Sequence, residues 1–278
     1  MITDIRLAGQ QLAAPRFDTP KKLISWMGAI QAQDYAMARW AVGIRLKSAT
    51  ARSVGEAFSR GEILRTHVMR PTWHLVAAED IRWMLKLSAR RIRSANESLA
   101  KGRQLELTEQ LHYRCDRLLE KMLEGNRNLT KQQIGEELNR QGIAADTPRL
   151  TRLLMRAETE AVVCSGPFSG GRQTYALLEE RVPPVPELHP DEALAKLATA
   201  YFRSHSPASL QDFVWWSGLS VTEARHSVGL IGRSLTAERF GQRELFVHES
   251  CRAAETSGVP LYLLPAYDEY LIGYKDRT

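Results

Sequence analysis

The stretch that decides the fold opens with Thr130-Lys-Gln-Gln133 and continues to Leu178. Thr130 and Gln133 have the spacing of a capping box, which predicts a helix that begins here and ends at Gly142. Asp146-Thr147-Pro148 predicts a second helix start, because proline is favoured at the first helical position. We therefore expect two helices separated by a short turn.

Two strands are predicted directly after these helices. Ala161-Val-Val-Cys-Ser165 and Gln173-Thr-Tyr-Ala-Leu-Leu178 have the composition of strands, and Gly166-Pro-Phe-Ser-Gly-Gly171 between them favours a turn. Two helices followed by two strands with a glycine-rich turn indicate a winged helix-turn-helix unit.

The same order of elements is predicted near the start of the chain. Thr19 and Pro20 open a helix whose apolar residues recur at helical spacing as far as Ile30. A short helix over residues 53–60 follows. Residues 62–76, rich in β-branched and aromatic side chains, are then predicted to form a hairpin.

A third copy of this order is predicted in the last part of the chain. Helices are expected over residues 191–204 and from Ser206-Pro207 onward, and Ser220 with Glu223 forms another capping box. Residues 234–248 are predicted to form the wing. Trp215 and Trp216 lie within an apolar run and are expected in the core.

These patterns predict a mainly α chain with small β-hairpin wings (an α+β fold), built from three tandem winged helix-turn-helix units. The predicted division is residues 1–125 with long helices, residues 126–181, a Pro-rich linker over 182–190, and residues 191–278.

Composition narrows the class of protein. The 278 residues carry a net charge of +6, and the pI is about 9.3, which favours anionic partners, with nucleic acid as the first candidate. No apolar run approaches the roughly 20 residues of a membrane-spanning helix, and no signal pattern is present. Three scattered cysteines without a C-x-x-C spacing favour a reducing cytosol.

Two stripes of basic residues on predicted helices are suited to DNA phosphates. Their members are Arg82, Lys86, Arg90 and Arg93 on the helix after the first hairpin, and Arg149, Arg152 and Arg156 on the helix that recognition would use. A salt-bridged, solvated face is the alternative for the second stripe, because Glu158 and Glu160 lie nearby in sequence.

Arg65, His67, Arg70 and His74 in the 62–76 hairpin are further candidates for DNA contact. As a zinc pair the two histidines lack a third ligand nearby, so a hydrogen-bonded or DNA-facing role is favoured over metal binding. No metal and no cofactor are expected.

Gly28-Ala-Ile-Gln31-Ala-Gln33-Asp34, at the end of the first apolar helix, places two carboxamides and a carboxylate close together. Such a set can position a polar ligand or a water molecule. A solvated helix end with a capping aspartate is the alternative interpretation of the same residues.

Four blocks resemble the winged-helix family of the AlkZ and YcaQ DNA glycosylases, in order along nearly the whole chain. They are Gly28-Ala-Ile-Gln-Ala-Gln-Asp34, Leu64-Arg-Thr-His-Val-Met-Arg-Pro-Thr-Trp-His-Leu-Val76, Ser209-Leu-Gln-Asp-Phe-Val-Trp-Trp-Ser-Gly-Leu219, and Leu264-Pro-Ala-Tyr-Asp-Glu-Tyr-Leu-Ile-Gly-Tyr-Lys-Asp-Arg277.

The resemblance implies a C-shaped arrangement of three winged helices around a basic channel for double-stranded DNA. It implies excision of alkylated bases and unhooking of interstrand crosslinks, with Gln31-Ala32-Gln33 matching the Gln-x-Gln branch of the catalytic motif. Family members commonly continue past the last block, so whether the third unit is truncated after Thr278 stays open.

The residues themselves permit a specific chemistry. An alkylated, cationic purine leaves readily, so Gln31 and Gln33 need only place a water and direct carbonyl dipoles at a cationic sugar. Asp34 can supply base strength that a carboxamide lacks, or it can simply terminate a helix. No lysine adjoins the motif, so a monofunctional hydrolase without strand cleavage is expected.

Two other classes of function fit the winged-helix pattern. A noncatalytic DNA-binding regulator would bind sequence-specifically and would not depend on Gln31 or Gln33. A protein-interaction scaffold would respond weakly to DNA and to salt. For the glycosylase interpretation we expect a cytoplasmic, nucleoid-associated monomer.

Overall fold

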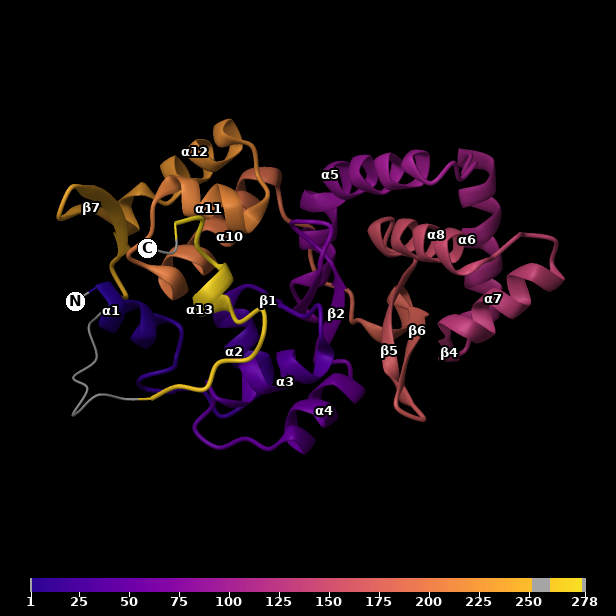
Figure 1. Cartoon of the computed structure of the whole chain (residues 1–278), viewed down its shortest axis with the longest axis horizontal. Coiled ribbons are helices and arrows are strands. Elements are labelled where there is room, and N and C mark those ends of the chain that lie inside the picture. Colours follow the sequence, from indigo (N-terminus) through magenta and orange to yellow (C-terminus); the bar gives the residue numbers. More distant parts are fainter. Residues whose placement is uncertain (1, 252–260, 277–278) are drawn as a thin grey trace. The chain divides into compact units, whose positions relative to one another are not determined.

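The computed structural model describes residues 2–251 and 261–276. These residues form mainly helices, together with small antiparallel sheets (Figure 1). The chain forms two compact units. The terminal unit comprises Met1–Ala57, His74–Ala77 and Leu188–Thr278, and the middle unit comprises Phe58–Trp73 and Ala78–Glu187. This division reflects which residues contact one another. The predicted domain boundaries after residues 125, 181 and 190 rest instead on the winged-helix pattern of the sequence, and they stay a prediction.

The terminal unit is built mainly from helices contributed by both ends of the chain. Its helices are α1 (Ile2–Gly9), α2 (Pro20–Met27), α3 (Tyr35–Gly43), α4 (Ala51–Ser59, whose last two residues belong to the middle unit), α10 (Pro190–His205), α11 (Leu210–Ser217), α12 (Val221–Leu230) and α13 (Glu269–Ile272). Its strands are β1 (Ile30–Gln31), β3 (Trp73–Ala77, from His74 on), β7 (Leu235–Phe240) and β8 (Arg243–His248), with a 3-10 turn, η1, over Gly232–Ser234.

The middle unit contains the stretch that opened the sequence argument. Its elements are β2 (Ile63–His67), α5 (Ile81–Gly102), α6 (Glu109–Leu123), β4 (Leu129–Thr130), α7 (Lys131–Arg140), α8 (Thr147–Thr159), β5 (Val163–Ser169), β6 (Arg172–Leu177) and α9 (Leu178–Arg181). Strands β4, β6 and β5 form an antiparallel sheet in that order. The order helix, helix, strand, strand after Thr130 is therefore as predicted.

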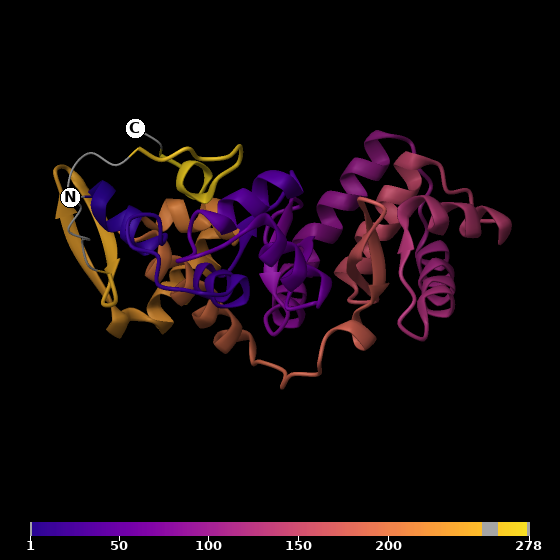
Figure 2. The same cartoon turned by 90° about the horizontal axis from the view of Figure 1, so that it is seen from below.

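Local capping signals account for where several helices begin. Thr19 caps α2 with Pro20 in the first turn, and Thr130 with Gln133 forms the predicted capping box of α7. Ser220 with Glu223 does the same for α12. Residues 183–189, within the predicted linker, carry no helix or strand (Figure 2).

Two predicted helix boundaries were wrong. The first apolar helix ends at Met27 rather than continuing to Ile30, because Gly28 has φ +81° and leaves the helical conformation. Its backbone also lies so close to α10 that a Cβ on Gly28 would be 2.9 Å from the Ala200 Cβ. Helix α11 begins after Ser209, whose capping box uses Asp212, and not at Ser206-Pro207.

Each unit has its own core. In the terminal unit an aromatic group surrounds Tyr201, whose ring centroid lies 4.6 Å from that of His205, 5.0 Å from Trp216 and 5.3 Å from Phe213. In the middle unit the buried leucine and isoleucine side chains of α6, α7 and α8 pack together beneath the β4–β6–β5 sheet, among them Leu119, Ile134 and Leu153. Trp216 is fully buried as expected, whereas Trp215 is 41% exposed.

A buried ion pair lies at the centre of the terminal unit. The Arg45 guanidinium donates to both carboxylate oxygens of Asp268, at 2.8 and 2.6 Å, and both side chains are fully buried. Arg45 also donates to Gln10 Oε1 at 3.1 Å, and Gln10 Nε2 donates to the Tyr274 hydroxyl at 3.2 Å. This network links the residues that follow α1 and α3 to the C-terminal segment.

We expect Asp268→Asn to lower the free energy of unfolding by about 3–5 kcal/mol, because the charge of Arg45 would stay buried without its carboxylate. Asparagine retains the cap that Asp268 provides to the Tyr270 N–H, so the loss reports on the ion pair. Urea denaturation measures it. Glu56→Gln, which removes the exposed Arg52–Glu56 pair, is the control and should cost less than about 1 kcal/mol. Equal losses would contradict the central role of the buried pair.

Candidate functional site

The Gln31-Ala32-Gln33 segment connects α2 to α3: Gln31 ends strand β1, and the chain bends at Gln33 and Asp34 before α3 begins. Ile30 and Ala32 are fully buried, while Gln31 is half-buried and Gln33 is exposed. Strand β1 pairs antiparallel with β3, with Gln31 opposite His74 and Ile30 opposite Leu75. Two buried apolar side chains thus anchor the segment and leave the second carboxamide facing outward.

The main chain of this segment is bound by a carboxylate from the other end of the sequence. The Gln31 N–H donates to Glu269 Oε1 at 2.6 Å. Trp216 Nε1 donates to Glu269 Oε2 at 3.0 Å, and His205 Nε2 lies 3.6 Å from that same oxygen. The Glu269 side chain is 1% exposed. One buried carboxylate therefore joins β1, α10, α11 and α13.

The surroundings keep Glu269 ionised. Burial alone raises its pKa, but the nearby His205, the Gln31 N–H and the field of His74 lower it, and the resulting pKa is below the usual 4.5. At 3.6 Å the His205 ring is too distant for a normal hydrogen bond, so its effect is electrostatic. A buried carboxylate held by two N–H donors is the stable form of this site.

Asp34 does not end a helix; it begins one. Its Oδ1 accepts the N–H groups of Ala36 and Met37 at 2.8 and 3.1 Å, which makes Asp34 the N-cap of α3. The carboxylate remains exposed. The alternative of a capping aspartate is thus correct, with the cap on the following helix instead of the preceding one.

The basic residues of α8 have different environments. Arg156 is 8% exposed and is bound by carboxylates: it donates to Glu109 at 3.1 and 2.9 Å and to Glu160 at 2.7 Å, and it lies 4.0 Å from Glu97. Arg152 instead donates to the Met155 sulfur at 3.6 Å, and Arg149 donates to the Glu106 carbonyl at 3.2 Å.

Arg152 belongs to a group of cations. Burial and the charge of Arg103 lower the pKa of Arg152, and burial and the charge of Arg152 lower the pKa of Lys131. The Lys131 ammonium donates to the Thr151 hydroxyl on α8. Mutual repulsion between cations is relieved when an anion binds, so this region is better suited to a phosphate than the Arg156 site.

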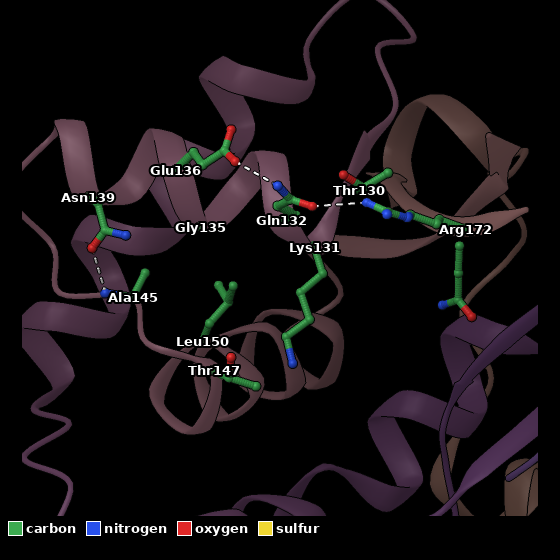
Figure 3. Close-up of a pocket in the computed structure, with 11 residues that line it drawn as sticks. Thr130, Lys131, Gln132, Gly135, Glu136, Asn139, Ala145, Thr147, Leu150 and Arg172 are labelled. Atoms are coloured by element: carbon green, nitrogen blue, oxygen red, sulfur yellow. Dashed lines mark hydrogen bonds between the residues drawn. The ribbon is translucent and has the colours of Figure 1, made fainter. Parts of the chain in front are cut away.

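Lys131 and Arg172 also line a cavity of about 470 Å³ between α7, α8 and β6. In Figure 3 the Lys131 side chain extends toward α8, while Arg172 donates to Gln132, which in turn donates to Glu136. Two cations, Lys131 and Arg172, therefore lie at this cavity, which is beside the β5–β6 hairpin.

The stripe on α5 is partly neutralised within the middle unit. Arg82 donates to Glu179 at 2.5 and 3.1 Å, Lys86 pairs with Glu187, and Arg93 lies 3.4 Å from Glu160. Arg90 is exposed. Three of the four basic side chains of this stripe are therefore paired with carboxylates of the same unit, and their contact with DNA stays a prediction.

The hairpin candidates are also held by neighbours. Arg65 donates to Gln173 Oε1 at 2.6 Å and lies over the Trp73 ring, 4.5 Å from its centroid. His67 Nδ1 is 2.7 Å from Glu158 Oε2, which confirms its hydrogen-bonded role. His74 is fully buried, and Arg70 is half-buried. Their contact with DNA stays a prediction.

Three observations concern metal binding, membrane-spanning helices and the cysteines of the described ranges. No group of three or more histidine, cysteine, aspartate or glutamate side chains there is arranged to hold a metal ion. No helix in those ranges combines the length and apolar character needed to cross a membrane. All three cysteines are free thiols, and burial raises the pKa of Cys115 and Cys164 to about 12.

Sequence reasoning missed the residues that hold the site. Glu269, Trp216 and His205 were not singled out as site residues, although the Trp-Trp and Asp-Glu-Tyr blocks that contain two of them are among the four quoted for the family resemblance. The available signal was that Glu269 lies within one of those quoted blocks, in an otherwise largely apolar and aromatic stretch.

Comparisons with known proteins find matches that extend over nearly the whole chain. The profile of the DNA glycosylase AlkZ-like family matches residues 24–278. The interstrand DNA cross-link repair glycosylase of Streptomyces sahachiroi is 25% identical over 288 aligned positions, which cover 95% of this chain and 74% of that protein. The solved structure of Streptomyces sahachiroi DNA glycosylase AlkZ has a TM-score of 0.73 at 22% identity, covering 98% of this chain and 76% of that chain.

The capping geometry of Asp34 predicts a clear pattern of stabilities. Asp34→Ala should lower the free energy of unfolding by about 1 kcal/mol, while Asp34→Asn should change it by only a few tenths, roughly, because asparagine caps helices as well as aspartate does. Urea denaturation measures both. Thr130→Ala at the N-cap of α7 is the matched control, with a similar loss. If Asp34→Asn lowers the free energy of unfolding as much as Asp34→Ala does, then the charge of Asp34, and not its capping hydrogen bonds, stabilises the fold.

Proposed function

The chain belongs to the AlkZ-like family of DNA glycosylases and is thus a DNA-repair hydrolase, and we propose that it releases cationic N7- or N3-alkylated purines from double-stranded DNA at Gln31-Ala32-Gln33. The observation that carries this assignment is the exposed Gln33 carboxamide on a segment whose backbone is fixed by buried neighbours. Because a relative is named as an interstrand cross-link repair glycosylase, crosslinked DNA is included among the proposed substrates.

The proposed reaction is hydrolysis of the N-glycosidic bond. Alkylation has already placed a positive charge on the base, so the bond's electron pair leaves with the base and neutralises it. A water oxygen then adds to C1′ of the sugar, and the water loses one proton to solvent. The carbonyl oxygens of Gln31 and Gln33 direct negative dipoles at the cationic sugar and hold the water in line.

Gln33 is assigned the position nearer the water, ahead of Asp34. The Asp34 Oδ1 atom already accepts two main-chain N–H groups, so this carboxylate has a structural role as the cap of α3. A carboxamide does not titrate near neutral pH, so this site acts on activated, cationic lesions and poorly on neutral bases. No Schiff base with a neighbouring lysine is part of the scheme.

The proposed scaffold is a series of winged helix-turn-helix units. Support comes from α7 and α8 followed by the β5–β6 hairpin, and from α11 and α12 followed by β7–β8. In the second of these, Gly218 in the left-handed conformation makes the turn between the helices. A third unit over residues 1–125, a C-shaped arrangement and a monomeric, cytoplasmic, nucleoid-associated protein complete the proposal.

Phosphate contact is assigned to three cations of the middle unit, one of which, Arg149, also lies 3.8 Å from the Asp146 carboxylate. Arg149, Arg152 and Lys131 lie around the N-terminal half of α8 and the start of α7, where helix dipoles add to the attraction of anions. Arg156 is left out of the proposed set because its guanidinium is held by Glu109 and Glu160.

The catalytic assignment predicts that Gln33→Ala slows base release by about 10²–10³, the range found when one stabilising hydrogen-bond partner is lost. Folding and DNA affinity should be nearly unchanged, because the side chain is exposed. The measurement is single-turnover release of N7-methylguanine from duplex DNA. Asp34→Asn is the control, which should release base at close to the parent rate. If Asp34→Asn abolishes release while Gln33→Ala spares it, the carboxylate is the base. No release by the parent from any N7- or N3-alkylated duplex would refute the proposed substrate.

The binding assignment predicts different salt dependences for neighbouring arginines. Replacing Arg149 and Arg152 with glutamine should reduce the slope of log K against log salt by about 0.9 for each lost phosphate contact. Arg156→Gln should leave the slope unchanged, because that side chain is buried among carboxylates. Titrations of a fluorescent duplex at several salt concentrations provide the test. A smaller slope for Arg156→Gln alone would place that residue, instead, in the interface.

A further inference from the structure

We propose that Glu269 is a positioning residue, whose buried carboxylate fixes the direction of the Gln31-Ala32-Gln33 segment through the Gln31 N–H. The inference rests on the proposed function of that segment. Glu269 does not face solvent and touches no substrate, so it acts on the reaction through the main chain that carries the two glutamines.

The first step of the argument is the geometry around the carboxylate. Each oxygen has its own donor: Oε1 accepts the Gln31 N–H at 2.6 Å, and Oε2 accepts Trp216 Nε1 at 3.0 Å. A hydrogen bond to an ionised acceptor is shorter and about twice as strong as a neutral one. The first of these two bonds leads directly to the motif, two residues before Gln33.

The second step is that Glu269 itself is held firmly. The preceding residue, Asp268, pairs with the buried Arg45, and Trp215 Nε1 donates to the Ile272 carbonyl at 3.0 Å. The Tyr201 hydroxyl donates to the Gly273 carbonyl at 3.0 Å. A Cβ on Gly273 would lie 2.7 Å from the Glu269 carbonyl oxygen and 2.8 Å from His205 Cδ2, so the segment is tightly packed.

The third step is that a carboxylate is needed, and an amide of the same shape is not enough. Glutamine has one acceptor oxygen and one donor NH₂ group. If the oxygen faces Gln31, the NH₂ group meets the Trp216 N–H; if the amide is turned around, the NH₂ group meets the Gln31 N–H. One buried donor is left without an acceptor in either case, which shifts the segment or weakens its hold.

Purely structural roles do not account for this placement as well. The ion pair of Arg45 with Asp268 already attaches the C-terminal segment to the unit, one residue away. The additional carboxylate reaches the functional segment, and its two N–H donors come from that segment and from α11. The arrangement is that of an outer residue that orients a residue of the reaction site.

Several titratable groups face this carboxylate and define its response to pH. They are His205 on α10 and His74 on β3, which act on Glu269 directly, and Tyr201 on α10, on which both Glu269 and Asp212 act. The pKa of Glu269 is lower in the folded protein than the ordinary 4.5. Its contribution to stability is therefore complete above about pH 4.5 and is lost as the pH falls through the lower, folded value.

The test compares Glu269→Gln with Tyr201→Phe in the full-length protein. Tyr201→Phe removes one buried hydrogen bond to the same C-terminal segment without touching Gln31, so it is a matched control for stability. Three quantities are measured for each variant: the Gln31 amide proton shift by NMR, single-turnover release of N7-methylguanine, and the Kd for duplex DNA.

We expect Glu269→Gln to move the Gln31 amide proton upfield, because the charge-assisted bond is lost, and to slow base release by about 10–100-fold with an unchanged Kd. Tyr201→Phe should lose stability yet keep the Gln31 shift and release base within about threefold of the parent rate. In the parent, the Glu269-dependent part of the Gln31 shift should stay constant from pH 8 to pH 5.

Several outcomes would overturn the proposal. An unchanged Gln31 shift in Glu269→Gln shows that the carboxylate does not hold the segment, and equal slowing by both variants shows a role in stability alone. If Glu269→Gln does not fold, Trp216→Phe replaces it: loss of the donor to Oε2 should shift the Gln31 signal and slow release, and no change in either refutes positioning. Failure of the parent to release base refutes the proposed substrate, while the Gln31 shift still decides the role of Glu269.

Discussion

The terminal unit depends on two adjacent buried carboxylates, Asp268 and Glu269. Removing a carboxylate from water is costly unless charges or strong donors replace the solvent. Arg45 satisfies Asp268, and the N–H groups of Gln31 and Trp216 satisfy Glu269. Because the partners come from the first 45 residues and from α11, the carboxylates can be buried only when both ends of the chain have assembled. Formation of the unit and formation of the candidate site are then the same event.

Signals that act within a few residues were readable from the sequence, and long-range ones were not. The caps at Thr19, Thr130 and Ser220 are local hydrogen bonds, and they lie where the pattern predicted. The end of α2 is different. Apolar periodicity continues to Ile30, yet close packing against Ala200 requires Gly28 and a positive φ. Nothing local to the sequence specifies that contact, just as nothing near Glu269 reveals its bond to Gln31.

Charge patterns are limited in the same way, because they do not reveal long-range contacts. Arg149, Arg152 and Arg156 have the spacing of one helix face, and the sequence left phosphate contact and a salt-bridged face as alternatives. The salt-bridged face describes Arg156, and phosphate contact stays a prediction for Arg149 and Arg152. Arg156 meets Glu109 from α6 and Glu97 from α5, residues 47 and 59 positions away, whereas Arg152 has other cations as neighbours. The spacing of basic residues fixes a helix face, and tertiary neighbours decide whether its charge is available.

The proposed reaction site is made of carboxamides, and such a site depends on the order of the structure around it. Glutamine has no charge, so its effect on a cationic sugar comes from a dipole whose contribution depends on direction as well as distance. A rotating side chain would average that dipole toward zero, so the direction of the segment that carries an exposed side chain such as Gln33 matters. The backbone must then supply the order. Burial of Ile30 and Ala32 fixes which side chains face inward, the cap of Asp34 sets the start of α3, and Glu269 holds Gln31 from beneath. The ionised groups around this site are thus used to orient neutral ones, which is consistent with a substrate that already carries the charge needed for its own departure.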